Sequence, residues 1–153
     1  MLYTKDRDAL VKETWQWVGT PYRGWSRTKR YGADCIGLVA GVYVNCGHLT
    51  KEEADASIPK GYSLQHGQHE ATTEYVDGIL KFMDEIQEHE ARPADVVMFK
   101  LTNSLAYAHS AIIVNMPMII HSTAHGGVRA ADIFKHPMLL GASRRYFTLQ
   151  DGR

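Results

Sequence analysis

The 153-residue sequence has only two cysteines and no excess of charge, with 17 basic and 17 acidic side chains. A balanced charge argues against nucleic acid or an anionic membrane surface as the main partner. No run approaches the roughly 18 consecutive apolar residues of a membrane span. The N-terminal residues are charged where a signal peptide requires an apolar core. We therefore expect synthesis in the cytoplasm without export by the general secretory route.

Internal repeats, low-complexity runs and linkers are also lacking, and the apolar content of 44% is ordinary for a globular chain. A chain of about 150 residues forms one domain and buries enough surface to fold without disulfide or metal. Neither Cys-x-x-Cys nor His-Glu-x-x-His occurs. We predict a single domain over residues 1–153, with no metal and no cofactor.

Two histidine pairs keep a metal site open as an alternative. His121 and His125 are four residues apart, and His66 and His69 are three apart. Zinc favours such pairs on a helix or with cysteine partners. Here the first pair straddles a strand end and a Gly-Gly turn, and the second lies in a polar loop. We therefore favour a chemistry without metal.

The first segment with helical periodicity covers residues 5–19, because four apolar side chains recur at helical spacing. They are Leu10, Val11, Trp15 and Val18. Thr4 is expected to cap the start of this helix, and Gly19 to end it. A polar loop follows, and its basic cluster is expected to be a solvated surface. That cluster is Arg23, Arg27, Lys29 and Arg30.

Residues 34–47, DCIGLVAGVYVNCG, are apolar on almost every helical face, which predicts a helix buried in the core. Asp34 suits the N-cap, and Gly47 suits the left-handed position beyond the C-terminus. Gly37 and Gly41, one turn apart, would let a neighbouring element approach closely. The two cysteines of this helix, 11 residues or about 16 Å apart along its axis, are too distant for a disulfide.

Two shorter helices are expected next. Thr50 and Glu53 form a capping box for a helix that ends before Pro59, and residues 60–71 read as a loop. A second helix is predicted over about residues 73–83. Its apolar residues are Val76, Ile79, Leu80 and Met83.

The period then becomes typical of strands, in short runs rich in Val and Ile. These runs are residues 94–101, 108–114, 117–123, 126–133 and 144–149. Helices followed by an antiparallel meander predict an α+β fold, with helices packed on one side of a curled sheet.

Cys35 falls in the first turn of the predicted buried helix, directly after the capping Asp34. Unpaired backbone N–H groups and the positive end of the helix dipole stabilise a thiolate there. The same N–H groups can donate to an oxyanion formed on an attacked carbonyl. Free cysteines are usually small buried hydrophobes, and Cys46 fits that description. We predict that Cys35 is a nucleophile and that Cys46 is structural.

A thiol nucleophile requires a base, and the sequence offers eight histidines. Those in polar loops or at helix ends are expected on the surface. They are His48, His66, His69, His89 and His136. His109 opens one apolar run and His121 closes the next, each six residues from Asn115. A turn centred on Asn115 would place the two histidines opposite one another on one face, where one takes the thiol proton and the other orients its ring. A slip of one residue would separate them.

Five blocks, in order from about residue 19 to 122, resemble the NlpC family of papain-like cysteine peptidases, which cut bacterial cell-wall peptides. They are GTPYRGW, YGADCIGLVAGVY, ARPADVVMF, AHSAIIV and IIHST. The resemblance implies that Cys35 is the nucleophile, His109 the base and His121 the residue that orients the base. It also implies that Tyr22 lines the site near the nucleophile.

Two residues depart from the family pattern. Ile36 replaces a Ser whose hydroxyl helps to receive the free amino end of the substrate, and Ala94 replaces the Gly of a Pro-Gly-Asp block. The Asp-Cys-aliphatic-Gly-Leu block resembles compact members carried by phages, prophages and gene-transfer agents. That likeness implies tail or tail-like particle proteins as partners and a virion-associated location.

The hypothesis is therefore a cysteine peptidase that hydrolyses an amide bond in peptidoglycan stem peptides, next to a D-glutamyl residue. Asp34 and Tyr22 are expected beside the substrate and the oxyanion, and a thiolate–imidazolium pair of Cys35 and His109 is expected. One alternative is a non-catalytic tail assembly or plug component that kept the fold, which Ile36 supports. Another is an acyltransferase or amidase of the same superfamily.

Overall fold

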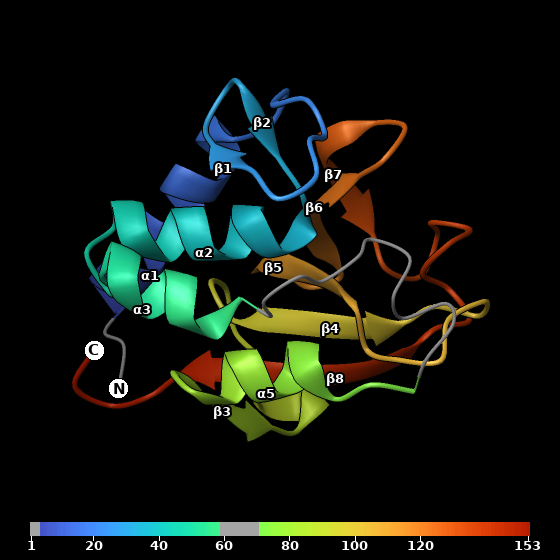
Figure 1. The fold of residues 1–153 in the computed structure, drawn as a ribbon. Coiled ribbons are helices and arrows are strands. Elements are labelled where there is room, and N and C mark those ends of the chain that lie inside the picture. The colour runs from blue at the N-terminus through green and yellow to red at the C-terminus, as the bar shows by residue number, and fades with distance from the viewer. Residues whose placement is uncertain (1–3, 59–70) are drawn as a thin grey trace.

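The computed structural model describes residues 4–58 and 71–153 of the chain (Figure 1). Within these ranges, helices precede a six-stranded antiparallel sheet, as an α+β fold requires. None of the helices described is long and apolar enough to cross a membrane. The predicted loop at residues 60–71, with His66 and His69, lies almost wholly outside the described residues.

Helix α1 (Thr4–Gln16) is present, but its buried face differs from the predicted one. Thr4 already belongs to the helix instead of capping it, and Trp15 and Val18 are 47% and 41% exposed. The inward face carries Arg7, Leu10, Thr14 and Trp17. Two polar members of this face form hydrogen bonds inside the protein: Arg7 donates to Asp95 at 2.9 Å and Thr14 to the Leu10 carbonyl at 2.7 Å. Of the four predicted apolar residues, Leu10 is buried and Val11 packs against the core, whereas the other two face solvent.

Helix α2 (Cys35–Asn45) has the predicted caps. The Asp34 carboxylate accepts a hydrogen bond from the Gly37 N–H at 2.6 Å, and Gly47 adopts a φ of +79° just beyond the helix. Cys46 is the C-cap residue, and both cysteines are free. The Asp34 cap sets the residue at which the helix starts, and hence the position of Cys35.

Helix α3 (Lys51–Ser57) begins with the predicted Thr50–Glu53 capping box. Helix α5 (Glu74–Leu80) ends earlier than predicted, because Met83 belongs to strand β3 (Met83–Ile86). Strand β3 pairs with the last strand of the chain, a partner more than 55 residues away. The predicted helix was too long because the apolar residues at positions 76, 79, 80 and 83 have helical spacing across the end of α5 and the start of β3.

The main sheet has the order β3-β8-β4-β5-β6-β7, and every pair in it is antiparallel. Its remaining strands are β4 (Val96–Lys100), β5 (His109–Asn115), β6 (Met118–Thr123), β7 (Gly127–Asp132) and β8 (Ser143–Leu149). Strands β4 to β7 form the predicted meander, whereas β8 inserts between β3 and β4. A two-stranded ribbon, β1 (Arg27–Thr28) and β2 (Gly32–Ala33), precedes α2, and a short 3₁₀ helix, η1 (Glu88–Glu90), follows β3.

The two faces of the sheet are covered differently. Helix α2 packs on β5 and β6, and α5 on β3, so these helices share one core with the sheet (Figure 1). The opposite face forms a second apolar cluster with residues that follow β7, among them Ile133 and Leu139. Because each strand alternates between the faces, neighbouring residues of β5 and β6 enter different environments.

Ala94, at the position of the family's glycine, adopts a left-handed backbone with a φ of +79° and is fully buried. The backbone has therefore kept the conformation that suits glycine, at a cost on the order of 1 kcal/mol for an L-residue. The Ala94 carbonyl accepts a hydrogen bond from the Tyr43 hydroxyl of α2, which ties the start of β4 to the helix.

The glycines of α2 permit close contacts, as predicted. A Cβ on Gly37 would lie 2.0 Å from the Ser26 carbonyl oxygen, and one on Gly41 would lie 2.4 Å from the Trp17 ring. The first contact joins helix α2 to the loop before it, and it involves backbone that cannot move aside without shifting the loop.

We expect Gly37→Ala to lower the free energy of unfolding by about 1–3 kcal/mol, because the added methyl overpacks against a carbonyl. Gly141→Ala is the matched control, since its Cβ would meet only Thr102 at 3.7 Å. Urea denaturation of both variants measures the difference. Equal stabilities would contradict the close contact.

Candidate active site

The β5–β6 hairpin carries both histidines predicted as a pair. Its register places Ile112 opposite Ile120 and Ile113 opposite Ile119. Continuing that register sets His109 opposite residue 123, so the predicted direct opposition of His109 and His121 is wrong by two residues. The turn is centred between residues 116 and 117 and not on Asn115. A shift of two residues leaves a side chain on the same face, and the pair therefore still meets.

The two imidazoles are in hydrogen-bond contact, with 2.8 Å between His109 Nε2 and His121 Nδ1. His121 is fully buried, whereas His109 is partly exposed and lines a cavity. One imidazole must donate across this contact. If His109 Nδ1 is to accept a proton, its Nε2–H is the donor and His121 Nδ1 the acceptor. His121 then fixes both the orientation and the tautomer of His109.

Serines on the same two strands bind the backbone at the start of helix α2. The Ser110 hydroxyl donates to the Cys35 carbonyl at 3.1 Å, and the Ser122 hydroxyl donates to the Ala33 carbonyl at 2.7 Å. Strand alternation thus points serines toward the helix and histidines toward the opposite face. The hairpin positions the start of α2 and supplies the imidazoles at the same time.

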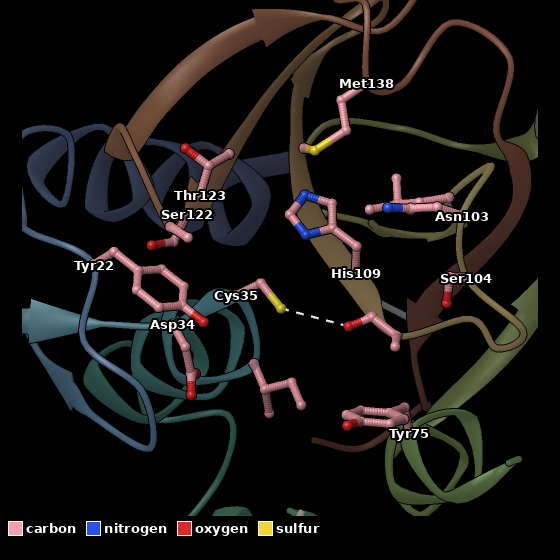
Figure 2. Close-up of a pocket in the computed structure, with 14 residues that line it drawn as sticks. Tyr22, Asp34, Cys35, Tyr75, Asn103, Ser104, His109, Ser122, Thr123 and Met138 are labelled. Atoms are coloured by element: carbon pink, nitrogen blue, oxygen red, sulfur yellow. Dashed lines mark hydrogen bonds between the residues drawn. The ribbon is translucent and has the colours of Figure 1, made fainter. Parts of the chain in front are cut away.

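Cys35 is the first residue of α2, and its thiol lies in the cavity that His109 lines. Figure 2 shows the sulfur and the His109 ring in the same cavity, with the dashed line marking the thiol's hydrogen bond to the Ala108 carbonyl at 3.6 Å. The cavity measures about 190 Å³. The structure therefore brings Cys35, His109 and His121 together as the sequence predicted.

Asp34 and Tyr22 also line this cavity. Asp34 is almost fully buried, and its two carboxylate oxygens accept backbone N–H groups of Gly37 and Trp25 at 2.6 and 2.7 Å. Its carboxylate therefore joins the preceding loop to the helix start. Burial, with the nearby Cys35, raises the pKa of Tyr22, so its hydroxyl stays protonated and can donate. Figure 2 shows that hydroxyl directed into the cavity.

The pKa of the Cys35 thiol is raised, whereas its position at the helix start predicted a lowered pKa. Burial, followed by the Asp34 carboxylate, raises the pKa of Cys35 to about 11, and hydrogen bonds from Ser110 and the Ile36 N–H only partly offset this. Burial, followed by His136, lowers the pKa of His109 to about 4. Both shifts favour a thiol beside a neutral imidazole over the expected thiolate–imidazolium pair.

His136, which the sequence assigned to the surface, belongs to the same cluster. Its ring lies perpendicular to that of His121 with centroids 5.3 Å apart. Its Nδ1 accepts the Met138 N–H at 3.2 Å, within the segment that follows β7. Its approach depends on how that irregular segment folds back over the sheet, and no spacing in the sequence signals it.

The second cysteine and three further histidines lie apart from this site. Cys46 donates to the Ala9 carbonyl on α1, His48 contacts the backbone of Arg153, and His89 and His125 are exposed. Across residues 4–58 and 71–153, no group of three or more potential ligands is arranged for a metal ion. The basic loop is partly paired: Lys29 contacts Glu13 at 2.8 Å, and Arg27 contacts Asp55 at 2.6 Å.

The NlpC/P60 family model matches residues 19–140, and the chain therefore belongs to the NlpC/P60 family. That match includes every residue of the site described above. No curated protein matches the sequence.

Several solved structures share the fold. The NlpC/p60 domain of the peptidoglycan hydrolase SagA is 16% identical, with a TM-score of 0.57 over 91% of this chain and 96% of that one. NlpC1 from Trichomonas vaginalis is 18% identical, with a TM-score of 0.63 over 97% of this chain but only 46% of that one. RipD from Mycobacterium tuberculosis is 15% identical, with a TM-score of 0.56 over 97% and 100%, and is described as a non-catalytic peptidoglycan-binding domain. The fold therefore occurs both with and without catalysis.

We expect the His109 imidazole to titrate well below the ordinary histidine pKa of about 6.5, because burial disfavours its charged form. Long-range ¹H–¹⁵N NMR spectra across pH 3.5–8 measure this pKa and the tautomer together. The urea-unfolded protein is the control. A pKa of His109 above 6.5 would contradict a neutral resting pair.

The same shift makes stability depend on pH. In the unfolded chain the His109 imidazole binds a proton near pH 6.5, but in the folded chain its pKa is about 4. The free energy of unfolding should therefore fall as the pH decreases from about 6.5 to 4, by on the order of 3 kcal/mol for a shift of this size. His109→Asn removes the titrating ring, and its urea denaturation should show a shallower decline over that window.

Proposed function

We propose that the protein is a cysteine peptidase that hydrolyses an amide bond in peptidoglycan stem peptides. One observation carries the proposal: Cys35 and His109 line the same cavity, and the His109 ring is in hydrogen-bond contact with His121 at 2.8 Å. A nucleophile, a base and a residue that orients the base form the minimal set for acyl transfer.

Catalysis begins when Cys35 Sγ attacks the scissile carbonyl carbon and its proton passes to His109 Nδ1. The carbonyl electron pair moves to oxygen, which the Cys35 backbone N–H and the Tyr22 hydroxyl stabilise. The imidazolium returns the proton to the leaving amine as the C–N bond breaks, which leaves a thioester on Cys35. Water then attacks the thioester, its proton passes to His109, and that proton returns to sulfur as the C–S bond breaks.

A neutral Cys35 thiol beside a neutral His109 imidazole defines the role of His109 in these reaction steps. Because the raised pKa of Cys35 and the lowered pKa of His109 favour the neutral pair, His109 acts in this mechanism as a general base during attack and not as a counter-ion to a preformed thiolate. His121 limits the motion of the ring while it gains and loses the proton. The helix start contributes its N–H groups to the oxyanion, where negative charge develops only in the transition state.

Membership of the NlpC/P60 family supports the substrate class, because the family includes the peptidoglycan hydrolase SagA. Within that class we propose a bond next to a D-glutamyl residue. A role in a phage tail or tail-like particle is proposed on the likeness of the Asp-Cys-Ile-Gly-Leu block to the compact members of the family.

We expect Cys35→Ala to lower the release of fragments from purified peptidoglycan by about a thousandfold or more, because it removes the only atom that forms the acyl bond. Mass spectrometry of the products measures the loss and identifies the bond. Cys46→Ala, which changes the other free cysteine, is the matched control and should retain activity. Circular dichroism checks that both variants fold.

A non-catalytic binding role is the second candidate, favoured by the raised pKa of Cys35 and by the fold shared with RipD. The same experiment separates the two functions. Wild-type protein that binds peptidoglycan without releasing any fragment, and Cys35→Ala protein that binds it equally well, would replace the peptidase proposal with this one.

A further inference from the structure

The His121 imidazole has one ring nitrogen that its contact with His109 leaves unpaired. Its Nδ1 lies 2.8 Å from His109 Nε2, whereas its Nε2 is buried and has no hydrogen-bond partner within residues 4–58 and 71–153. When His109 Nδ1 is to accept the thiol proton, His109 Nε2–H donates to His121 Nδ1. A neutral imidazole carries one N–H, so the proton of His121 then lies on Nε2. A buried N–H without an acceptor is unfavourable, and this tautomer therefore requires a further contact.

The position of His136 suits it to make that contact. The sheet face that carries the two catalytic-site histidines is covered by the segment that follows β7, to which His136 belongs. Met138 of the same segment lines the cavity together with His109 (Figure 2). Since Nε2 lies at the end of an imidazole farthest from the backbone, the Nε2 of His121 is directed to the side of the sheet on which this segment lies. The His136 ring stands at 87° to the His121 ring, with centroids 5.3 Å apart, which is an edge-to-face arrangement.

The hydrogen bonding of His136 leaves the face of its ring to receive a donor. Its Nδ1 accepts the Met138 N–H at 3.2 Å, so a neutral His136 carries its proton on Nε2. Neither nitrogen then has a lone pair to offer, but the π face of the ring can accept an N–H group. Burial, with a contribution from His136, lowers the pKa of His109 to about 4 and that of His121 to about 3. The close approach of the three rings thus favours neutral imidazoles, for which the choice of tautomer matters.

We propose that His136 is a positioning residue: the face of its ring receives the Nε2–H of His121 and thereby holds His121 and His109 in the tautomers that leave His109 Nδ1 unprotonated. The two tautomers are coupled through one shared hydrogen bond. If His121 carried its proton on Nδ1, that N–H would donate to His109 Nε2, and the proton of His109 would lie on Nδ1, where it prevents transfer from the thiol. The inference rests on the proposed function, because it is the peptidase reaction that requires His109 Nδ1 to act as the base.

Two substitutions at one position isolate the ring face. His136→Phe keeps an aromatic face, whereas His136→Leu removes it, and both lose the acceptor for the Met138 N–H, so that loss cancels between them. Long-range ¹H–¹⁵N NMR spectra at neutral pH report the tautomer of each histidine. We expect the Nε2–H tautomer of His121 and His109 in wild-type and His136→Phe protein, and a mixture of tautomers in His136→Leu protein. Urea denaturation checks that both variants fold.

The rate of fragment release from purified peptidoglycan provides the second measurement. We expect His136→Leu to release fragments about tenfold or more slowly than His136→Phe, because an imidazole in the wrong tautomer cannot accept the thiol proton. His89→Ala is the control for loss of a histidine, since His89 is exposed and lies apart from the site. It should retain the wild-type rate and the wild-type tautomers of His109 and His121.

The spectra separate this inference from the proposed function. If wild-type protein releases no fragment, the peptidase proposal fails, but a tautomer change confined to His136→Leu would still support the contact. Equal tautomers in the Phe and Leu variants, or a His121 protonated on Nδ1 in wild-type protein, would overturn the inference. If His136→Leu does not fold, the wild-type spectrum decides: the ring current of His136 should move the His121 Nε2 proton upfield of an ordinary imidazole N–H, and an unshifted resonance would overturn the contact.

Discussion

The contact between the start of helix α2 and the β5–β6 hairpin is the constraint on which the site depends. Ser110 and Ser122 bind backbone carbonyls on either side of Asp34, and the Asp34 carboxylate closes the helix end and the preceding loop. The same two strands present His109 and His121 from their alternate positions. Because one hairpin supplies both the anchor and the imidazoles, the Cys35 thiol and the His109 imidazole are both positioned by the same element.

Burial sets the chemistry of this arrangement. The helix end and the hydrogen bonds at Cys35 favour a thiolate, but removal from water and the nearby Asp34 carboxylate outweigh them. The neighbouring imidazoles lose basicity for the same reason. A site with a neutral pair stores little charge before substrate binds. In the proposed reaction, stabilisation comes from N–H and hydroxyl groups aligned with the charge that develops during acyl transfer.

The His109–His121 pair illustrates how far periodicity carries and where it stops. Sequence reasoning placed the two residues on one face, and this is confirmed, because strand side chains alternate with a period of two. The exact partners were wrong, because the turn centre depends on the local geometry around Met116 and Pro117. The error was an even number of residues, and the pairing of the imidazoles survived it. An odd error would have separated them.

The sequence by itself determined that helices precede the antiparallel meander, the caps of α2 and α3, the absence of a bond between Cys35 and Cys46, and the meeting of His109 with His121 on one face. These features follow from local rules of spacing, capping and alternation. Only the tertiary structure decided the inward face of α1, the insertion of β8 between β3 and β4, the place of His136 beside His121 and the burial that raises the pKa of the Cys35 thiol. Each of these depends on which distant segments exclude water from a residue, and burial by a distant segment leaves no periodic trace in the sequence.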